Sequence, residues 1–406
     1  MHQESDARPT KMRLIDAVLS LWADAPADSI SVRALVQQAG AAQAAIHYHF
    51  GDVEHLFAEA SATALDRAKG WMEARLAALG GLAGGECATG LQASLIASTI
   101  ADWTGGERRL AMAARLVPGA GWQAAWDDFW TQLAALVGLG AHAPTLAAFA
   151  AGESARHLLV WNPPLDRALL EETAAALVLW LTERRFAPDP VRAAHQRLAL
   201  AGYARPAPRH DDALAASIAQ AAAELLAGEG HAGVTFRAVA ARAGVTLGKV
   251  INACGTKSEL LRGALHRLYE REALGGDAER FVARSFPPEV VLGHLLEAVL
   301  AGQPVLRAYD EIERAIYNGA EHADLRGVVR SMEDLSGAWA LQQMLGSQVP
   351  PAALVAAFSA VIRGIGSRVV HGGYSQGDLR SHALMELQPF APSEQWQDAG
   401  FVKSPR

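Results

Sequence analysis

Residues 31–56 read SVRALVQQAGAAQAAIHYHFGDVEHL, and a related stretch, TFRAVAARAGVTLGKVINACGTKSEL, occupies residues 235–260. The two stretches align without a gap at a constant separation of 204 positions, which pairs Arg33 with Arg237, Ala34 with Ala238, Ala39 with Ala243, Gly40 with Gly244, Gly51 with Gly255 and Leu56 with Leu260. A self-match at one separation is the mark of an internal repeat. We therefore expect one structural unit to occur twice.

The composition is that of a globular, helical protein. Hydrophobic residues make up 51% of the 406 residues and charged residues 19%, which excludes a disordered chain. Alanine is abundant and alternating β-branched runs are scarce, which favours an all-α fold. The length suits two or more domains.

Several classes of protein are not expected. No apolar run reaches the ~20 residues that span a bilayer, and the N-terminal MHQESDARPTKMR lacks the apolar core of a signal peptide. Cys87 and Cys254 are the only cysteines, so neither a disulfide framework nor a thiolate metal site is expected, and the cytosol is the expected location. The net charge is −7, so any contact with nucleic acid must come from a local basic patch.

The first repeat predicts four helices joined by short turns. Thr10 can cap the first helix and Ser31 the second. Gly40 stands where a left-handed turn residue is expected, a third short helix covers 42–49, and Asp52 can cap a fourth. This order is typical of a helix-turn-helix, whose second short helix enters the major groove of DNA. From the pattern alone, a three-helix core that binds no nucleic acid is an equal alternative.

The stretch resembles the N-terminal domain of the tetracycline-repressor (TetR) family of bacterial regulators. The residues that match the family pattern are Ser31, Val32, Arg33, Ala39, Gly40, Ile46, His49, Phe50, Glu54 and Leu56. His47 stands where the family has its first tyrosine, with Tyr48 beside it. Val53 replaces the lysine that contacts a phosphate in the family.

The second repeat resembles the family more closely at its start. Thr235 can cap its second helix and Gly244 makes the turn, within VTFRAVAARAGVTLGKV. It departs at Ile251 to Cys254, where the family has Tyr, a variable residue, His and Phe. Lys257 keeps the phosphate-contact lysine. Cys254 is expected to be an apolar filler, and the alternative is a redox or alkylation switch.

The resemblance implies an all-α chain of two TetR-like units. Each unit would have a three-helix helix-turn-helix domain and a helical domain for ligand binding and dimerisation. The expected segments are 1–60 (the first head), 61–187 (first effector domain), 188–210 (linker), 211–264 (the second head) and 265–406 (second effector domain). The tail from Ser381 is expected to be partly disordered.

In the family, late helices pair two subunits through a four-helix bundle. Ala151-Gly152 and Arg363-Gly-Ile-Gly366 place small residues on the corresponding helices of the two halves, which allows close approach. We therefore expect an internal pseudo-dimer, which could associate further with itself.

A ligand site is expected in the first effector domain, which is rich in tryptophan. A flat apolar or aromatic effector could bind there, with Arg115, Gln123, Asp127, Glu153 or His157 as polar groups. Ordinary core packing is the alternative for the tryptophan stripe. The candidate residues are Trp103, Arg115, Trp122, Trp126, Trp130, His157 and Trp161.

The candidate DNA contacts fall into three groups. Ser31 and Thr235, with the nearby helix N-terminal amides, could hold phosphates, and Arg33 and Arg237 match the family motif beside them. Residues placed to reach base edges or backbone are Gln43, His47 and Tyr48 in the first head and Thr246, Lys249 and Asn252 in the second. His49 and Lys257 would contact the backbone.

Charge distinguishes the two heads. Residues 1–60 hold four basic and eight acidic residues, whereas 205–272 hold nine basic and seven acidic residues. Neutralising phosphate charge supplies most non-specific affinity for DNA, so the second head should hold the backbone more strongly.

The expected function is a ligand-responsive transcriptional regulator, a repressor, that works on a double-stranded operator with two unlike half-sites at the bacterial nucleoid. The alternative is a TetR-fold module that binds a small molecule or a protein and has lost DNA binding. An enzyme is not expected, because the sequence has no His-x-x-x-His metal pair with a nearby acid, no Gly-x-Ser-x-Gly and no phosphate loop. No cofactor, metal or membrane partner is expected.

Overall fold

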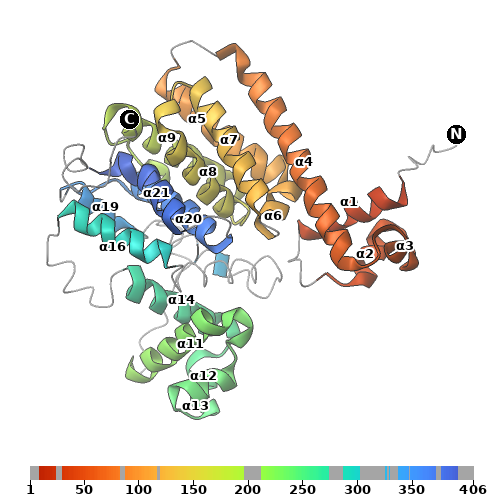
Figure 1. The fold of residues 1–406 in the computed structure, drawn as a ribbon. Coiled ribbons are helices and arrows are strands. Elements are labelled where there is room, and N and C mark those ends of the chain that lie inside the picture. The colour runs from red at the N-terminus through yellow and green to blue at the C-terminus, as the bar shows by residue number, and fades with distance from the viewer. Residues whose placement is uncertain are drawn as a thin grey trace.

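The computed structural model describes residues 9–23, 30–82, 87–116, 119–195, 212–273, 287–301, 325–326, 329, 337–346, 348–371 and 376–391. Every element within these ranges is a helix, and they contain no strand (Figure 1). The all-α fold predicted from the composition is confirmed for this part of the chain.

The first half begins with the first head and continues into a helical body. The head contains α1 (Thr10–Trp22), α2 (Val32–Ala39), α3 (Ala44–Phe50) and the start of α4 (Val53–Leu79). The body adds η2 (Gly80–Leu82), α5 (Thr89–Ala101), η3 (Asp102–Gly106), α6 (Arg108–Leu116), α7 (Ala120–Leu136), η4 (Gly140–His142), α8 (Ala143–His157) and α9 (Pro163–Glu183).

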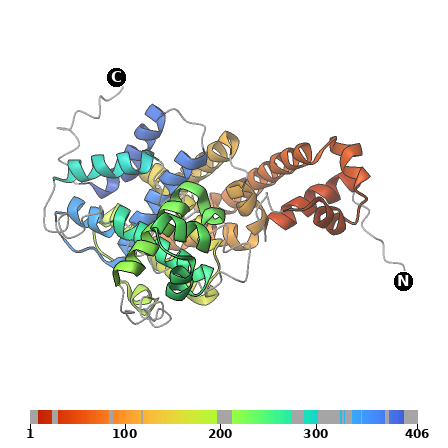
Figure 2. The same cartoon turned by 90° about the horizontal axis from the view of Figure 1, so that it is seen from below.

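The second half begins with the segment named above as the second head and continues into further helices. Its head contains α11 (Asp212–Gly233), α12 (Phe236–Ala243), α13 (Leu247–Cys254) and the start of α14 (Lys257–Ala273). Its body helices are α16 (Pro288–Leu300), α19 (Ala338–Met344), α20 (Ala352–His371), α21 (Gln376–Leu387) and η6 (Gln388–Phe390). In Figure 1 helices α1–α3 lie at the right of the body and α11–α13 lie below it, and in Figure 2 the N-terminal helices again project from the body.

Most of the predicted helix boundaries of the first head are confirmed. Ser31 caps α2 by accepting a hydrogen bond from a backbone N–H three residues on, and Asp52 caps α4 in the same way. Gly40 ends α2 with φ 56°, a conformation that glycine adopts at little cost. The prediction for Thr10 was wrong. It is the first residue of α1, after Pro9, and its hydroxyl accepts a hydrogen bond from Arg13.

Continuous helices run across two of the expected domain boundaries. Residues 60 and 264 lie inside the continuous helices α4 and α14. The expected linker at 188–210 is helical over 190–195, and the rest of it lies outside the described residues. The expectation of partial disorder from Ser381 was wrong up to Phe390, because α21 and η6 occupy this stretch and Phe390 is fully buried.

Body helices from both halves share one buried core. This core joins α5, α7, α8 and α9 to α16, α19, α20 and α21. Aromatic rings from both halves contribute to it, among them Phe149, Phe358 and Phe390, all with no exposed surface. Removing so much apolar surface from water is the main stabilising force between the halves.

The most extensive contact between two helices of the described chain is the crossing of α8 and α20. A Cβ atom on Gly152 of α8 would overlap the carbonyl oxygen of Ala360, and one on Gly364 of α20 would overlap that of Ala148. The contact is reciprocal. Ala360 and Gly364 lie 212 positions after Ala148 and Gly152, and the glycine of each helix contacts the alanine of the other. The close approach expected from the small residues therefore occurs at Gly152 and Gly364.

These glycines set the separation of α8 and α20, so enlarging either should destabilise the chain. We predict that Gly152→Ala and Gly364→Ala each lower the free energy of unfolding by about 1–3 kcal/mol, because an overpacked backbone crossing must open. The two losses should be similar because the two contacts are equivalent. Urea denaturation of each variant measures them.

Gly70→Ala is the matched control for this experiment. Gly70 is an exposed residue inside α4, and no atom of the described residues lies within 4 Å of an added Cβ. Alanine there should raise stability by up to ~1 kcal/mol through helix propensity. A loss for Gly70→Ala equal to that of the crossing variants would contradict the role assigned to the crossing.

Candidate nucleic-acid interface and effector cavity

The outer face of the first head is formed by the start of α2 and by α3. Gln43 directly precedes α3, and His47 lies within it, both exposed. Tyr48 is 85% exposed, the largest exposure among the large apolar and aromatic side chains of the described chain. Ile46 and Phe50 face the core instead. The buried side chains of Ile46 and Phe50 hold α3 against the core, and its exposed face remains available to a partner.

His47 and His49 differ in how the head holds them. The Nδ1 atom of His47 lies 2.8 Å from the carbonyl oxygen of Gly51, so Nδ1 carries the proton and donates to it. In the neutral ring Nε2 is then an acceptor, able to receive a base amino group. His49 is half-buried, and its ring makes edge contacts with Tyr48 and Phe50.

The second head repeats this local geometry. Thr235 caps α12 by accepting a hydrogen bond from a backbone N–H three residues on, as Ser31 does for α2. Gly244 ends α12 with φ 66°, compared with 56° at Gly40. Gly255 also has a positive φ, as Gly51 does. The cap and the turn that bound α12, and the turn that ends α13, therefore match those of α2 and α3.

The exposed face of α13 is mixed in character. Thr246 precedes the helix with a side chain that makes no capping bond, while Lys249 and Asn252 are exposed along it. Leu247 and Ile251 are 40% and 45% exposed on the same helix. Sequence reasoning selected the polar residues and missed these two, although the departure from the family pattern begins at Ile251. Apolar side chains of this kind contact thymine methyl groups in the major groove.

The basic side chains of the first head are mostly engaged within it. Lys11 forms an ion pair with Glu59 and lies over the ring of Phe50. Arg13 donates to the carbonyl oxygen of Gly40, 3.3 Å away. Arg33 is exposed at the start of α2 and makes no ion pair with any described residue. It is therefore the basic group of this face best placed to meet a phosphate.

In the second head more positive charge remains available. Arg242 pairs with Glu224 and Glu229. Arg237 and Lys249 are exposed, Lys257 is half-buried at the start of α14, and none of these three forms an ion pair within the described part of the chain. The structure thus keeps the difference in charge that the sequence predicted between the heads.

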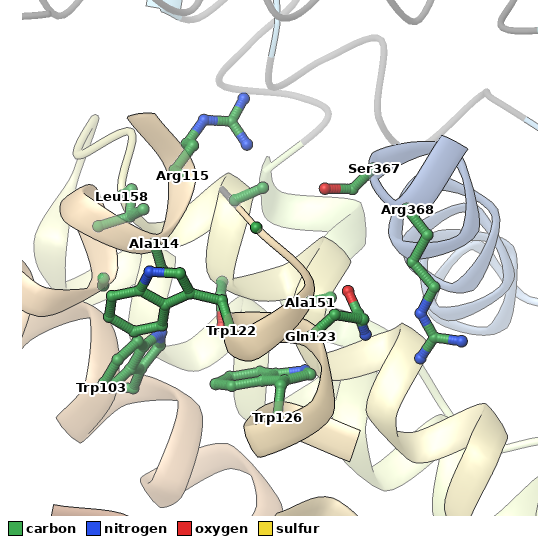
Figure 3. A pocket seen from close by; sticks show the side chains of 14 residues that line it. Trp103, Ala114, Arg115, Trp122, Gln123, Trp126, Ala151, Leu158, Ser367 and Arg368 are labelled. Atoms are coloured by element: carbon green, nitrogen blue, oxygen red, sulfur yellow. The ribbon is translucent and has the colours of Figure 1, made fainter. Parts of the chain in front are cut away.

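A cavity of about 120 Å³ lies in the body between the two halves. Trp103, Trp122 and Trp126 line one side of it, and Arg368 of α20 lies on the other, with Gln123 between them (Figure 3). The other described residues that line it are Ala111, Ala114, Arg115, Gly119, Ala151, Ser154, Ala155, Leu158 and Ser367.

The cavity brings together four of the seven predicted ligand residues: Trp103, Arg115, Trp122 and Trp126. Trp130, His157 and Trp161 do not line it. Trp130 lies one turn further along α7, inside the core. His157 is held by Glu153, 3.1 Å from its Nε2, and the Trp161 ring packs against His195.

Sequence reasoning missed the contribution of α20 to this cavity. Arg368 is buried and contacts Glu386 of α21 and Asp127 of α7, the latter at 2.6 Å. The sequence does contain a pattern that indicates Arg368. Ala148, Gly152 and Arg156 of α8 recur 212 positions later as Ala360, Gly364 and Arg368, with the same four-residue spacing.

The buried carboxyls beside these two arginines behave differently. Burial opposes ionisation of Glu153, but the charge of Arg156, 2.6 Å away, and the hydrogen bond from His157 lower its pKa to about 2. Burial raises the pKa of Glu386 to about 8, since Arg368 offsets desolvation incompletely and Asp127 adds a like charge. The other carboxyl oxygen of Glu386 has no hydrogen-bond partner among the described residues.

The described part of the chain contains no cluster of three or more His, Cys, Asp or Glu side chains able to hold a metal ion. Among the same residues, no helix is long and apolar enough to cross a membrane.

Residues 14–60 match the model of the family described as "Bacterial regulatory proteins, tetR family". The matched part of the first head is therefore similar to the DNA-binding domain of that family. The matched segment runs from α1 into α4 and includes both short helices of the helix-turn-helix. It supports a transcriptional regulator of the TetR type. No curated protein matches the chain.

The raised pKa of Glu386 predicts a loss of stability as the pH rises. Its folded-state pKa of about 8 lies above the ordinary value of 4.5, so the folded chain holds a proton that the unfolded chain releases. The contribution of Glu386 to stability therefore falls between about pH 4.5 and pH 8. Denaturant unfolding at pH 6 and pH 9 should show Glu386→Gln gaining stability relative to the parent at the higher pH.

Glu297→Gln serves as the control, since Glu297 forms an exposed ion pair with Arg380. Its stability relative to the parent should change little over this pH range. If the stability of the Glu386→Gln variant and that of the parent change equally between pH 6 and pH 9, the raised pKa assigned to Glu386 is contradicted.

Proposed function

We propose that the chain is a ligand-responsive repressor made of two fused TetR-like units, which act together as a pseudo-dimer on one operator. The observation that carries the proposal is the second head. Its caps, turns and short helices repeat those of the matched first head at a separation of 204 residues. Two heads on one body correspond to the two heads of a symmetric dimer on a palindrome.

The crossing of α8 and α20 supports the pseudo-dimer. In a two-fold interface, residue i of one subunit contacts residue j of the other, and j contacts i. The pairs Gly152 with Ala360 and Gly364 with Ala148 follow this rule within one chain. The surrounding core joins both halves, as a dimer interface would.

The two heads would read unlike half-sites. The first head presents His47 and Tyr48 and little free positive charge, whereas the second presents Lys249 with Leu247 and Ile251. Such different side chains recognise different base edges. The operator is then asymmetric.

Ligand response would pass through the elements that the cavity shares with the heads. Helix α6 lines the cavity with Ala111 and Arg115 and packs against α1 and α4 of the first head. Leu158 lines the cavity and lies in the buried cluster of the first head, while its neighbour Leu159 lies in that of the second. An effector that prefers one arrangement of these elements would shift both heads.

A binding module that has lost DNA binding is the second candidate function. The engaged basic groups of the first head and the exposed Leu247 and Ile251 of α13 favour it, because an apolar helix face also suits a protein partner.

One substitution in each head separates these candidates. We predict that Tyr48→Ala and Lys249→Ala each weaken binding to the operator by roughly 5- to 150-fold, the equivalent of about 1–3 kcal/mol. Lys249→Ala should also reduce the dependence of affinity on salt, since one fewer phosphate would be neutralised. Mobility shifts on the DNA flanking the gene, at about 50 and 200 mM salt, measure both effects.

Lys69→Ala is the control, because Lys69 is exposed on α4 beyond the head. It should bind as the parent does. If the parent binds DNA and neither Tyr48→Ala nor Lys249→Ala weakens that binding, the two-headed mode is contradicted. If the parent binds no DNA at either salt concentration, the binding module is favoured. Selection from random duplexes should yield two unlike half-sites, and a perfect inverted repeat as the best site would contradict the asymmetry.

A further inference from the structure

Two charged residues are found among the described residues that line the cavity, and both are cationic. Arg115 comes from α6 and Arg368 from α20, and no carboxylate is among these described lining residues. Trp103, Trp122 and Trp126 supply the broad apolar surface opposite Arg368 (Figure 3). A site with aromatic walls and cationic groups suits a ligand that is apolar at one end and anionic at the other.

Unpaired hydrogen-bond donors point to the same chemistry. Trp122 Nε1, Ser154 Oγ and Arg368 Nε are buried atoms of lining residues, and none has a hydrogen-bond partner among the described residues. A buried donor without an acceptor costs free energy, so such groups are expected to meet one when the site is filled. Indole and guanidinium groups only donate, so the missing partner must be rich in acceptors.

The size of the cavity limits the ligand. At about 120 Å³ it is slightly smaller than the ~150 Å³ engineered cavity that takes up one benzene molecule. The cavity is therefore of the size class that holds one aromatic ring, and a fused polycyclic molecule exceeds it. Three indole rings along one side favour a flat ring over a bulky aliphatic one.

We propose that the cavity binds a monocyclic aromatic carboxylate, with its ring among the tryptophans and its carboxylate on Arg368. This inference rests on the proposed function, because it names the effector class of the regulator. Arginine binds carboxylates through paired N–H groups, and Nε of Arg368 is the donor still available.

Such a ligand would join the two halves of the chain. Trp122 and Trp126 belong to α7 of the first half, and Arg368 belongs to α20 of the second. Arg368 already links α7 to α21 through Asp127 and Glu386. A carboxylate at Arg368 would compete with Asp127 for the guanidinium, so ligand binding would alter a contact between the halves.

The test is calorimetric titration of the full chain, without DNA, with sodium benzoate and with benzamide, its neutral analogue of the same shape. Benzoate should bind, and benzamide should bind at least tenfold more weakly because it lacks the charge that Arg368 meets. Arg368→Gln should weaken benzoate binding at least tenfold, whereas Arg109→Gln, an exposed residue of α6 outside the cavity lining, should leave it unchanged.

The absence of benzoate binding, equal binding of the two ligands, or full benzoate affinity in a folded Arg368→Gln variant would each overturn the inference. If Arg368→Gln does not fold, Trp122→Phe replaces it. This change keeps an aromatic wall but removes one unpaired donor, so weaker benzoate binding supports the site and unchanged affinity contradicts it. Benzoate binding by a chain that binds no operator would sustain the inference while the proposed regulator fails.

Discussion

The fold depends on the close crossing of α8 and α20. Because Gly152 and Gly364 carry no side chain, the two backbones approach until each glycine meets the carbonyl of an alanine on the other helix. Helices from both halves then pack around this contact into one core. The cavity forms beside the crossing and takes Ala151, Ser154 and Ala155 from α8 and Ser367 and Arg368 from α20. The crossing therefore determines both how the halves join and where a ligand would lie.

The heads combine shared architecture with different surfaces. Capping by Ser31 and Thr235 and turns at Gly40 and Gly244 set the same boundaries of the first short helix in each. These positions satisfy backbone geometry and are independent of what the outer face binds. The outer faces differ in charge and polarity, and the proposed operator with two unlike half-sites rests on this difference.

Local features of the fold could be predicted from the sequence because single residues determine them. Ser31, Gly40 and Asp52 were each assigned the role they have, since caps and left-handed turns depend on one side chain or on its absence. The cavity could be predicted only in part. Trp122 and Trp126 share a face of α7 and were recognised together, whereas Arg368 reaches the cavity from a helix more than 200 residues away. Such a contact depends on tertiary packing, which helical periodicity within one segment does not contain.

The mass of the protein–DNA complex tests the pseudo-dimer most directly. Light scattering on the chain bound to a duplex carrying the footprinted operator gives the number of chains per duplex. Two heads in one chain predict one chain of 43.0 kDa per operator, with protection of two unlike half-sites on one footprint. Two chains per operator, each protecting an identical half-site, would contradict the pseudo-dimer, because each chain would then supply only one head.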